Sequence, residues 1–201
     1  LMVAGNWKMN GDLALARELL PQLKKMLSNK PNVLCQLFPA FIYLEKIVEL
    51  SKNSGVAIGA QNVSALLKGA HTGEVSLPML HSVGVNTVLL GHSERRHVYN
   101  ETDTLIAKKT QLAIEQGFHV IFCVGETLEE READITNRVV KRQLAAVLSE
   151  PKLLENITIA YEPVWAIGTG KTASPQQAQE VHSFIRNEVN KVNAHRAEAM
   201  H

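Results

Sequence analysis

Three residues of the chain have side chains that suit proton transfer, and each follows a separate short apolar run. They are Lys8, His92 and Glu162, with Asn6, Ser93 and Glu94 beside them. A carboxylate can act as a base, an imidazole can polarise an oxygen atom, and an ammonium group can balance negative charge. If the three met, they would suit the movement of a proton on a small anionic substrate.

Each of these residues alone also fits an ordinary structural role. Lys8 could be a solvated surface lysine, His92 could bond a neighbouring backbone group, and Glu162 could close the end of a strand. Glu94 and the two arginines after it could form a local ion-pair cluster, which contributes little if exposed. The joint occurrence after separate apolar runs is what favours a functional site.

The elements that must position these residues alternate along the chain. Short apolar runs predict buried strands, and the segments between them have the spacing of amphipathic helices. The predicted strands are 2–5, 33–38, 56–61, 87–90, 119–124 and 158–161, and the predicted helical faces are 16–27, 105–116, 139–148 and 175–189. Thr102 or Asp103 would cap the second helix and Ser174 the fourth, with Pro175 in its first turn.

Strand–helix–strand order predicts parallel pairing with right-handed crossovers, which leaves an open doubly wound sheet or a closed (β/α)8 barrel. Residues 5–11 read Gly-Asn-Trp-Lys-Met-Asn-Gly, so the first strand is not followed by a dinucleotide-binding fingerprint. This favours the parallel α/β barrel, of which the sequence supplies six of the eight strand–helix units. With no linker or repeat, residues 1–201 are expected to form a single domain. In such a barrel the site lies at the carboxyl ends of the strands.

Composition excludes several classes of partner. Lys and Arg total 21 against 20 Asp and Glu, so the net charge of +1 argues against a nucleic-acid partner. No stretch approaches the length of a membrane span, and no signal peptide is visible. Cys35 and Cys123 lie in apolar runs without metal-ligand spacing. We therefore expect reduced, buried thiols, a cytoplasmic protein and no bound metal.

The segment after Glu162 is unusual for a loop. Residues 163–172 place Trp165 and Ile167 before Gly168 and Gly170. An apolar loop next to a base predicts a lid that excludes water, and the glycines would allow its backbone N–H groups to approach a phosphate. A nucleotide-binding P-loop is excluded, because Trp165 occupies the position that its first glycine requires.

Four segments resemble signature segments of the triosephosphate isomerase family. They are 5–10 (Gly-Asn-Trp-Lys-Met-Asn), 91–96 (Gly-His-Ser-Glu-Arg-Arg), 123–126 (Cys-Val-Gly-Glu) and 160–170 (Ala-Tyr-Glu-Pro-Val-Trp-Ala-Ile-Gly-Thr-Gly). They occur in the family's order and at its separations, and the resemblance extends to about Arg186. It implies a cytoplasmic enzyme of glycolysis and gluconeogenesis that interconverts dihydroxyacetone phosphate and D-glyceraldehyde 3-phosphate without a cofactor.

The resemblance also implies a role for each site residue. Glu162 would be the base, His92 would polarise the substrate oxygens as a neutral imidazole, and Lys8 with Asn6 would bind the phosphate and the developing enediolate. Gly168 in the lid would bind the phosphate, and the supporting residues would be Ser93, Glu94 and Cys123, with Glu94 near Lys8.

Family members are typically homodimers in which a loop after the third strand enters the neighbouring subunit, and here that loop would be 62–74. The family continues into two further strand–helix units with glycine-rich phosphate segments, which this sequence does not contain. We therefore expect either a partial sequence of an active isomerase or an inactive barrel fragment that serves at most as a non-catalytic binding module. Another phosphosugar enzyme on the same barrel, such as an epimerase, is a third alternative.

Overall fold

The computed structural model describes residues 1–199 and divides the chain into two compact units. Among the described residues, the first contains Leu1–Leu89 and Gln116–His119, and the second contains Leu90–Glu115 and 120–199. Each unit is described by itself below, and the single domain expected over residues 1–201 stays a prediction. No helix within residues 1–199 is long and apolar enough to cross a membrane.

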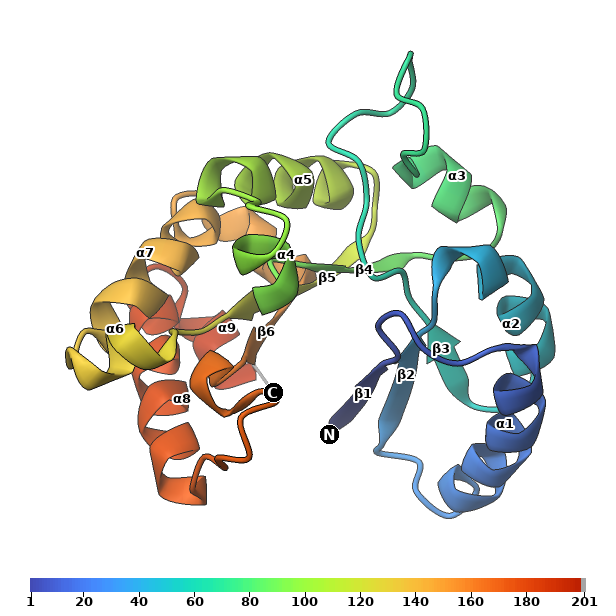
Figure 1. Cartoon of the computed structure of the whole chain (residues 1–201), viewed down its shortest axis with the longest axis horizontal. Helices are drawn as coiled ribbons and strands as arrows, with labels where there is room; N and C mark the ends of the chain where they lie inside the picture. Colours follow the sequence, from blue (N-terminus) through green and yellow to red (C-terminus); the bar gives the residue numbers. More distant parts are fainter. Residues whose placement is uncertain (200–201) are drawn as a thin grey trace. The chain divides into compact units, whose positions relative to one another are not determined.

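The first unit is built on a parallel sheet in the order β1–β2–β3 (Figure 1). Its elements are β1 (Met2–Asn6), α1 (Leu13–Leu27), β2 (Leu34–Phe38), η1 (Phe41–Tyr43), α2 (Leu44–Ser51), β3 (Val56–Ile58) and α3 (Leu77–Ser82). The register aligns Asn6 with Phe38, so β1 and β2 end together. Beyond β3, Ala60 forms a parallel bridge with Val88 of β4 (Thr87–Leu90).

The second unit contains β5 (His119–Val124) and β6 (Ile157–Tyr161), which pair in parallel, and the sheet order is β4–β5–β6. The register aligns Val124 with Tyr161, so the residues that follow the two strands are neighbours. The helices are α4 (Ser93–His97), α5 (Asp103–Glu115), α6 (Leu128–Glu132), α7 (Thr136–Leu148), η2 (Pro151–Asn156), η3 (Val164–Ala166), α8 (Pro175–Asn190) and α9 (Ala194–Ala199). In Figure 1, α7 lies between α5 and α8.

Local sequence explains where the longer helices begin. The Ser174 side chain accepts a hydrogen bond from Gln177 N and the Gln177 side chain returns one to Ser174 N, so α8 begins with the predicted capping residue and Pro175 in its first turn. Thr102 Oγ1 accepts from Leu105 N and thereby caps α5. Asp12 caps α1 through Leu15 N. Each cap satisfies a backbone donor that the first turn leaves free.

Two predicted helical faces were partly wrong. Met26 is 64% exposed on α1, and Leu105 is 36% exposed on α5, whose buried residues are Ile106, Lys109, Thr110 and Ala113. Because Lys109 and Thr110 occupy buried positions of α5, the apolar residues alone did not indicate which face of this helix is buried. The helix also ends at Glu115, before Gln116, because Gly117 adopts a positive φ of 79°.

The strand predicted at 56–61 was too long. β3 ends at Ile58, and Ala60 pairs with β4 instead of β2. The hypothetical Cβ of Gly59 would lie 2.2 Å from the Phe38 ring, so only glycine allows the chain to pass β2 here. The shorter helices α2, α3, α4, α6 and α9 were not predicted, since they have too few turns to show a clear period.

Candidate active site

Glu162 and His92 lie at the ends of β6 and β4, and their side chains meet. His92 Nε2 is 3.0 Å from Glu162 Oε1. Ser93 N donates to the other carboxylate oxygen, Oε2, at 2.9 Å. The side chains of His92 and Glu162 are 7% and 18% exposed, so the pair is largely shielded but still open to a small molecule. The structure therefore brings together a carboxylate and an imidazole from separate strands.

The hydrogen bonds of His92 determine which ring nitrogen carries the proton. His92 is the N-cap of α4, and its Nδ1 accepts from Glu94 N at 3.2 Å. Because Nδ1 is an acceptor, the proton of the neutral ring sits on Nε2. That N–H points at Glu162 Oε1, and the carboxylate of Glu94 lies 3.7 Å from Nδ1. The ring is thus held ready to donate a hydrogen bond from Nε2.

Arg96 fixes the backbone that precedes His92. Its Nε donates to Gly91 O at 2.7 Å, one of its terminal nitrogens donates to Cys123 O at 3.1 Å, and the other donates to Asp103. Gly91 has a positive φ of 74°, and a Cβ there would lie 2.8 Å from both Arg96 and Cys123 O. Only glycine therefore allows the guanidinium to bridge the ends of β4 and β5.

Cys123 lies beside the carboxylate of Glu162. Burial raises the pKa of the Cys123 thiol well above its usual value, and the negative charge of Glu162 raises it further, while Arg96 opposes the shift. The thiol therefore stays protonated, so it is a neutral neighbour of the carboxylate and a poor nucleophile.

Asn6 and Lys8 belong to the first unit, where the backbone of Lys8 is tightly held. Asn6 Oδ1 accepts from Lys8 N at 2.9 Å. Gln61 Nε2 donates to Lys8 O and to Phe38 O, both at 2.8 Å. Lys8 has a positive φ of 54°, and these bonds offset the strain of that conformation. Gln61 was missed in the sequence, although it ends the predicted strand 56–61.

Comparison with known proteins shows the family to which the chain belongs. The sequence profile of the family described as "Triosephosphate isomerase" matches residues 1–201. The chain belongs to the triosephosphate isomerase family. A protein of that name from Treponema denticola is 51% identical over 186 residues, which cover 92% of this chain and 74% of the relative. Another from Hydrogenovibrio crunogenus is 48% identical over 201 residues, which cover 98% and 79%.

Membership confirms three predictions from the sequence: the triosephosphate isomerase family, the parallel (β/α) barrel fold class and an isomerase as the class of enzyme. Membership also supports the predicted interconversion of triose phosphates, which is favoured over a non-catalytic module. Within residues 1–199 no group of three or more His, Cys, Asp or Glu side chains is placed to bind a metal ion.

The triosephosphate isomerase fold also holds a buried carboxylate that the sequence analysis missed. Glu126 is completely buried, and its Oε1 accepts hydrogen bonds from Tyr161 Oη at 3.0 Å, Trp165 Nε1 at 3.0 Å and a terminal nitrogen of Arg131 at 3.2 Å. Its Oε2 has no partner within the described chain. Arg131 also lies over the Trp165 ring, 5.2 Å from its centre. This group is called the Glu126 cluster below.

The Glu126 cluster fixes the start of the segment predicted as a lid. Trp165 is 7% exposed, and Val164–Ala166 form a short 3-10 helix. The first part of the apolar segment is therefore packed against the protein and is less exposed than expected for a lid. Beyond this anchor, Ile167, Gly168 and Gly170 are exposed. Gly168 and Gly170 have φ values of 70° and 75°. The described conformation thus has a fixed base and an open tip.

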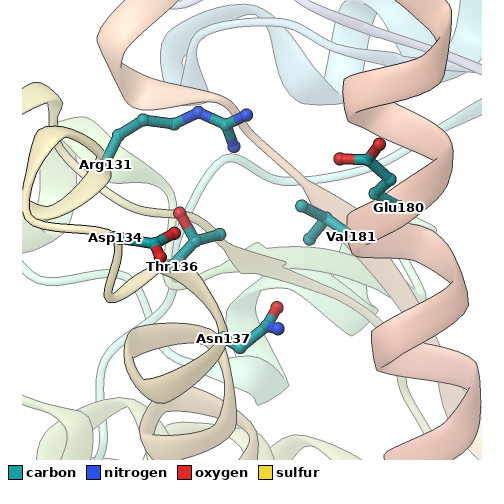
Figure 2. Close-up of a pocket in the computed structure, with 6 residues that line it drawn as sticks. All are labelled: Arg131, Asp134, Thr136, Asn137, Glu180 and Val181. Carbon is teal, nitrogen blue, oxygen red and sulfur yellow. The ribbon is translucent and has the colours of Figure 1, made fainter.

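A polar cavity of about 300 Å³ lies next to the Glu126 cluster (Figure 2). It is lined by Arg131, Asp134, Thr136, Asn137, Glu180 and Val181. Figure 2 shows Glu180 and Val181 on one helix, facing the other four residues across the cavity. Arg131 therefore borders this cavity and the Glu126 cluster at once, and none of the predicted site residues lines the cavity.

Tyr161 makes stability depend on pH in alkaline solution. Burial, reinforced by the charge of Glu126, raises the pKa of the Tyr161 hydroxyl from 10.0 to about 12. The pKa of Tyr161 is higher in the folded state than in the unfolded state. The contribution of its protonated hydroxyl to the free energy of unfolding is therefore complete below pH 10.0 and is lost as the pH rises towards about 12. We expect Tyr161→Phe to flatten the fall in melting temperature across this range.

The measurement is a pH series of thermal melts, with Tyr43→Phe as the matched control. Tyr161 and Tyr43 are both partly buried, but only Tyr161 bonds to Glu126. An unchanged alkaline slope in Tyr161→Phe would rule out this linkage.

Proposed function

We propose that the protein interconverts dihydroxyacetone phosphate and D-glyceraldehyde 3-phosphate, with Glu162 as the base that moves the proton. The observation that carries this proposal is the Glu162–His92 pair, with Nε2 and Oε1 3.0 Å apart and Nδ1 used as an acceptor. A base beside a neutral N–H donor is what removal of a proton next to a carbonyl group requires.

The proposed reaction assigns one task to each member of the pair. Glu162 takes a proton from the carbon next to the substrate carbonyl. The electron pair of that C–H bond forms the C=C bond of the enediolate, and the π pair of the C=O bond moves to the carbonyl oxygen. The Nε2–H of His92 donates to that oxygen as its negative charge grows. A hydroxyl proton then passes from the neighbouring substrate oxygen to the former carbonyl oxygen. Glu162 returns its proton to the former carbonyl carbon, and the C=C electron pair forms that C–H bond as the new C=O bond forms. Substrate must enter between the two side chains, so His92 exchanges its bond to Glu162 for one to the substrate.

Charge on the substrate is balanced in this proposal by residues outside the pair. Lys8 faces the phosphate and the developing enediolate, with Asn6 beside it, and Ser93 and Cys123 support the carboxylate. Glu94 supports the ring of His92 through its backbone N–H. Gly168 offers its backbone N–H to the phosphate, and its positive φ and exposed position support this role.

Residues 163–172 are the lid in this proposal. The Glu126 cluster holds the base of the segment through Trp165, while the exposed tip is free to close over a phosphate. Closure removes water from around Glu162, which makes its carboxylate a stronger base. It also protects the enediolate phosphate, which would lose its phosphate group in water.

A coupled assay that follows isomerisation in both directions, together with release of inorganic phosphate, tests the function. The proposal expects rapid isomerisation with little phosphate release from the purified enzyme. Triose binding without turnover would instead indicate a non-catalytic module. Turnover of a different phosphosugar, without the trioses, would indicate an epimerase-like enzyme.

We also propose that the enzyme is a homodimer joined through residues 62–74. Leu66 and residues 68–74 are exposed, while a bond from Ser64 N to Val75 O closes the base of the loop at 2.8 Å. Within the first unit, Figure 1 shows this segment extending away from α3. A long exposed loop with apolar and glycine residues is better suited to an interface than to solvent.

Replacing residues 66–72 by a Gly-Ser linker of the same length is expected to convert the dimer into a monomer. The closing bond at Ser64 remains, so the fold of the first unit should persist. Sedimentation velocity measures the change, with exposed Lys30→Glu as the control. A fully active wild-type enzyme that sediments as a monomer would refute the interface.

We further propose that the enzyme acts in the cytoplasm, in glycolysis and gluconeogenesis. Cys35 and Cys123 are both free and buried, which is typical of proteins from a reducing compartment and supports this location.

A further inference from the structure

A buried glutamine on α7 binds both backbone groups of one residue at the end of β5. Gln143 is 2% exposed. Its Oε1 accepts from Gly125 N at 2.8 Å, and its Nε2 donates to Gly125 O at 3.0 Å. The primary amide thus pairs with Gly125 as a neighbouring strand would. Both groups would otherwise be buried without a partner, which is costly.

Gly125 in turn supports the backbone of Glu162. A Cβ on Gly125 would lie 1.8 Å from Glu162 O, so the two chains are in contact with no room for a side chain. Glu162 N donates to Val124 O at 2.8 Å. The backbone of Glu162 therefore rests on residues 124–125, and residue 125 is held in place by Gln143.

We propose that Gln143 is a positioning residue for the base Glu162, acting through Gly125. This inference rests on the catalytic role proposed above for Glu162. A shift of Gly125 would move the Glu162 backbone, and with it the carboxylate that meets His92 and Ser93. A misplacement of about 1 Å can reduce the rate of a positioned reaction by roughly a hundredfold.

The chemistry of the pairing favours an amide in particular. Gly125 presents one donor and one acceptor, and the side chain of Gln143 supplies the matching acceptor and donor. An ionised carboxylate could accept from Gly125 N but would face Gly125 O with a second acceptor. A protonated carboxyl group could serve both, since it has one O–H donor and one acceptor.

The first test is Gln143→Met, which keeps the length of the side chain and removes both hydrogen bonds. We expect kcat to fall about tenfold to a hundredfold while KM changes less than about threefold, because the base moves and the phosphate contacts remain. The matched control is Val147→Ala, a fully buried residue one turn further along α7. We expect Val147→Ala to keep kcat near the wild-type value, even if its melting temperature falls as far as that of Gln143→Met.

The second variant, Gln143→Glu, gives a signature that a purely structural role would not produce. Burial favours the protonated carboxyl, and the pKa of a buried glutamate can reach about 8–9. We expect near-normal kcat in acidic solution and a fall in kcat relative to wild type as this group ionises. The readout is the ratio of the variant and wild-type kcat profiles, which remains measurable if Gln143→Met folds poorly.

A double-variant cycle separates this inference from the proposed role of Glu162. In a Glu162→Asp background, where the carboxylate is already displaced, Gln143→Met should reduce kcat much less than it does in the wild type. Three outcomes would each overturn the positioning role. The losses of kcat from Gln143→Met and Glu162→Asp could be additive, Val147→Ala could lose as much kcat as Gln143→Met, or the kcat ratio of Gln143→Glu to wild type could stay constant with pH. High activity of Glu162→Gln would instead overturn the catalytic role proposed for Glu162.

Discussion

Replacing Glu162 by glutamine is expected to lower kcat by about 10²–10⁴-fold or more, the contribution that a positioned general base typically makes. The amide has nearly the same shape, and its oxygen can still accept from Ser93 N. It cannot take a proton from carbon at neutral pH. The loss should therefore appear in kcat for both directions of the reaction, with little change in the melting temperature.

The control for this variant is Glu132→Gln, which alters an exposed carboxylate on α6 and leaves the His92 pair untouched. Steady-state kinetics with both triose phosphates, together with thermal melts, give the comparison. Near-normal turnover by Glu162→Gln would remove Glu162 from the mechanism, however close it lies to His92.

Replacing Lys8 by methionine should reduce kcat/KM by about 10²–10³-fold, the usual effect of removing one preorganised electrostatic group that stabilises a transition state. The loss should include a raised KM, because the same ammonium group is proposed to face the phosphate. The backbone of Lys8 is held by Asn6 and Gln61 through main-chain atoms, so the substitution leaves those bonds in place.

Lys8→Arg and Lys30→Met are the informative companions to this variant. Arginine keeps the charge but has a larger, planar head group, so we expect only partial recovery of activity. Lys30 is exposed, and its replacement should have no effect. A Lys8→Met enzyme with unchanged KM for both trioses would show that this ammonium group does not meet the substrate.

The sequence predicted the bounds of the six strands to within a few residues because parallel strands are short apolar runs, which helices of the same chain are not. The predicted burial was wrong for β1, where Val3 is 52% exposed. The departures have local physical causes. β3 stops early because Ala60 pairs with β4, a long-range pairing that periodicity does not encode. The face of α5 was misjudged because Lys109 is buried beside Glu101, with their charged atoms 2.7 Å apart, and so replaces an apolar residue.

For the site, residue types and order along the chain predicted which side chains matter, but not how they are held. The tautomer of His92 depends on a backbone N–H of α4, a short helix that was not expected. Glu126 ends one of the signature segments, but its partners could not be predicted, because Tyr161 and Trp165 lie 35 and 39 residues further along the sequence. The approach of Lys8 to the Glu162–His92 pair stays a prediction.

Gln143, in contrast, did leave a detectable signal. It lies between Val139, Val140, Leu144 and Val147, which are all buried on α7. A polar residue at an apolar position of a helix must find buried partners, so it should draw attention to the backbone that it faces. The same reasoning would have selected Gln61 at the end of the predicted third strand.

The burial of Trp165 against Arg131 and Glu126 provides the enzyme with an intrinsic optical reporter. The chain has two tryptophans, Trp7 and Trp165, and only the second has its indole N–H bonded to a buried carboxylate and its ring under a guanidinium. Indole emission responds to charges placed so close to the ring. A Trp7→Phe enzyme would therefore carry one fluorophore at the base of the proposed lid, and stopped-flow emission would time the proposed closure without any attached dye.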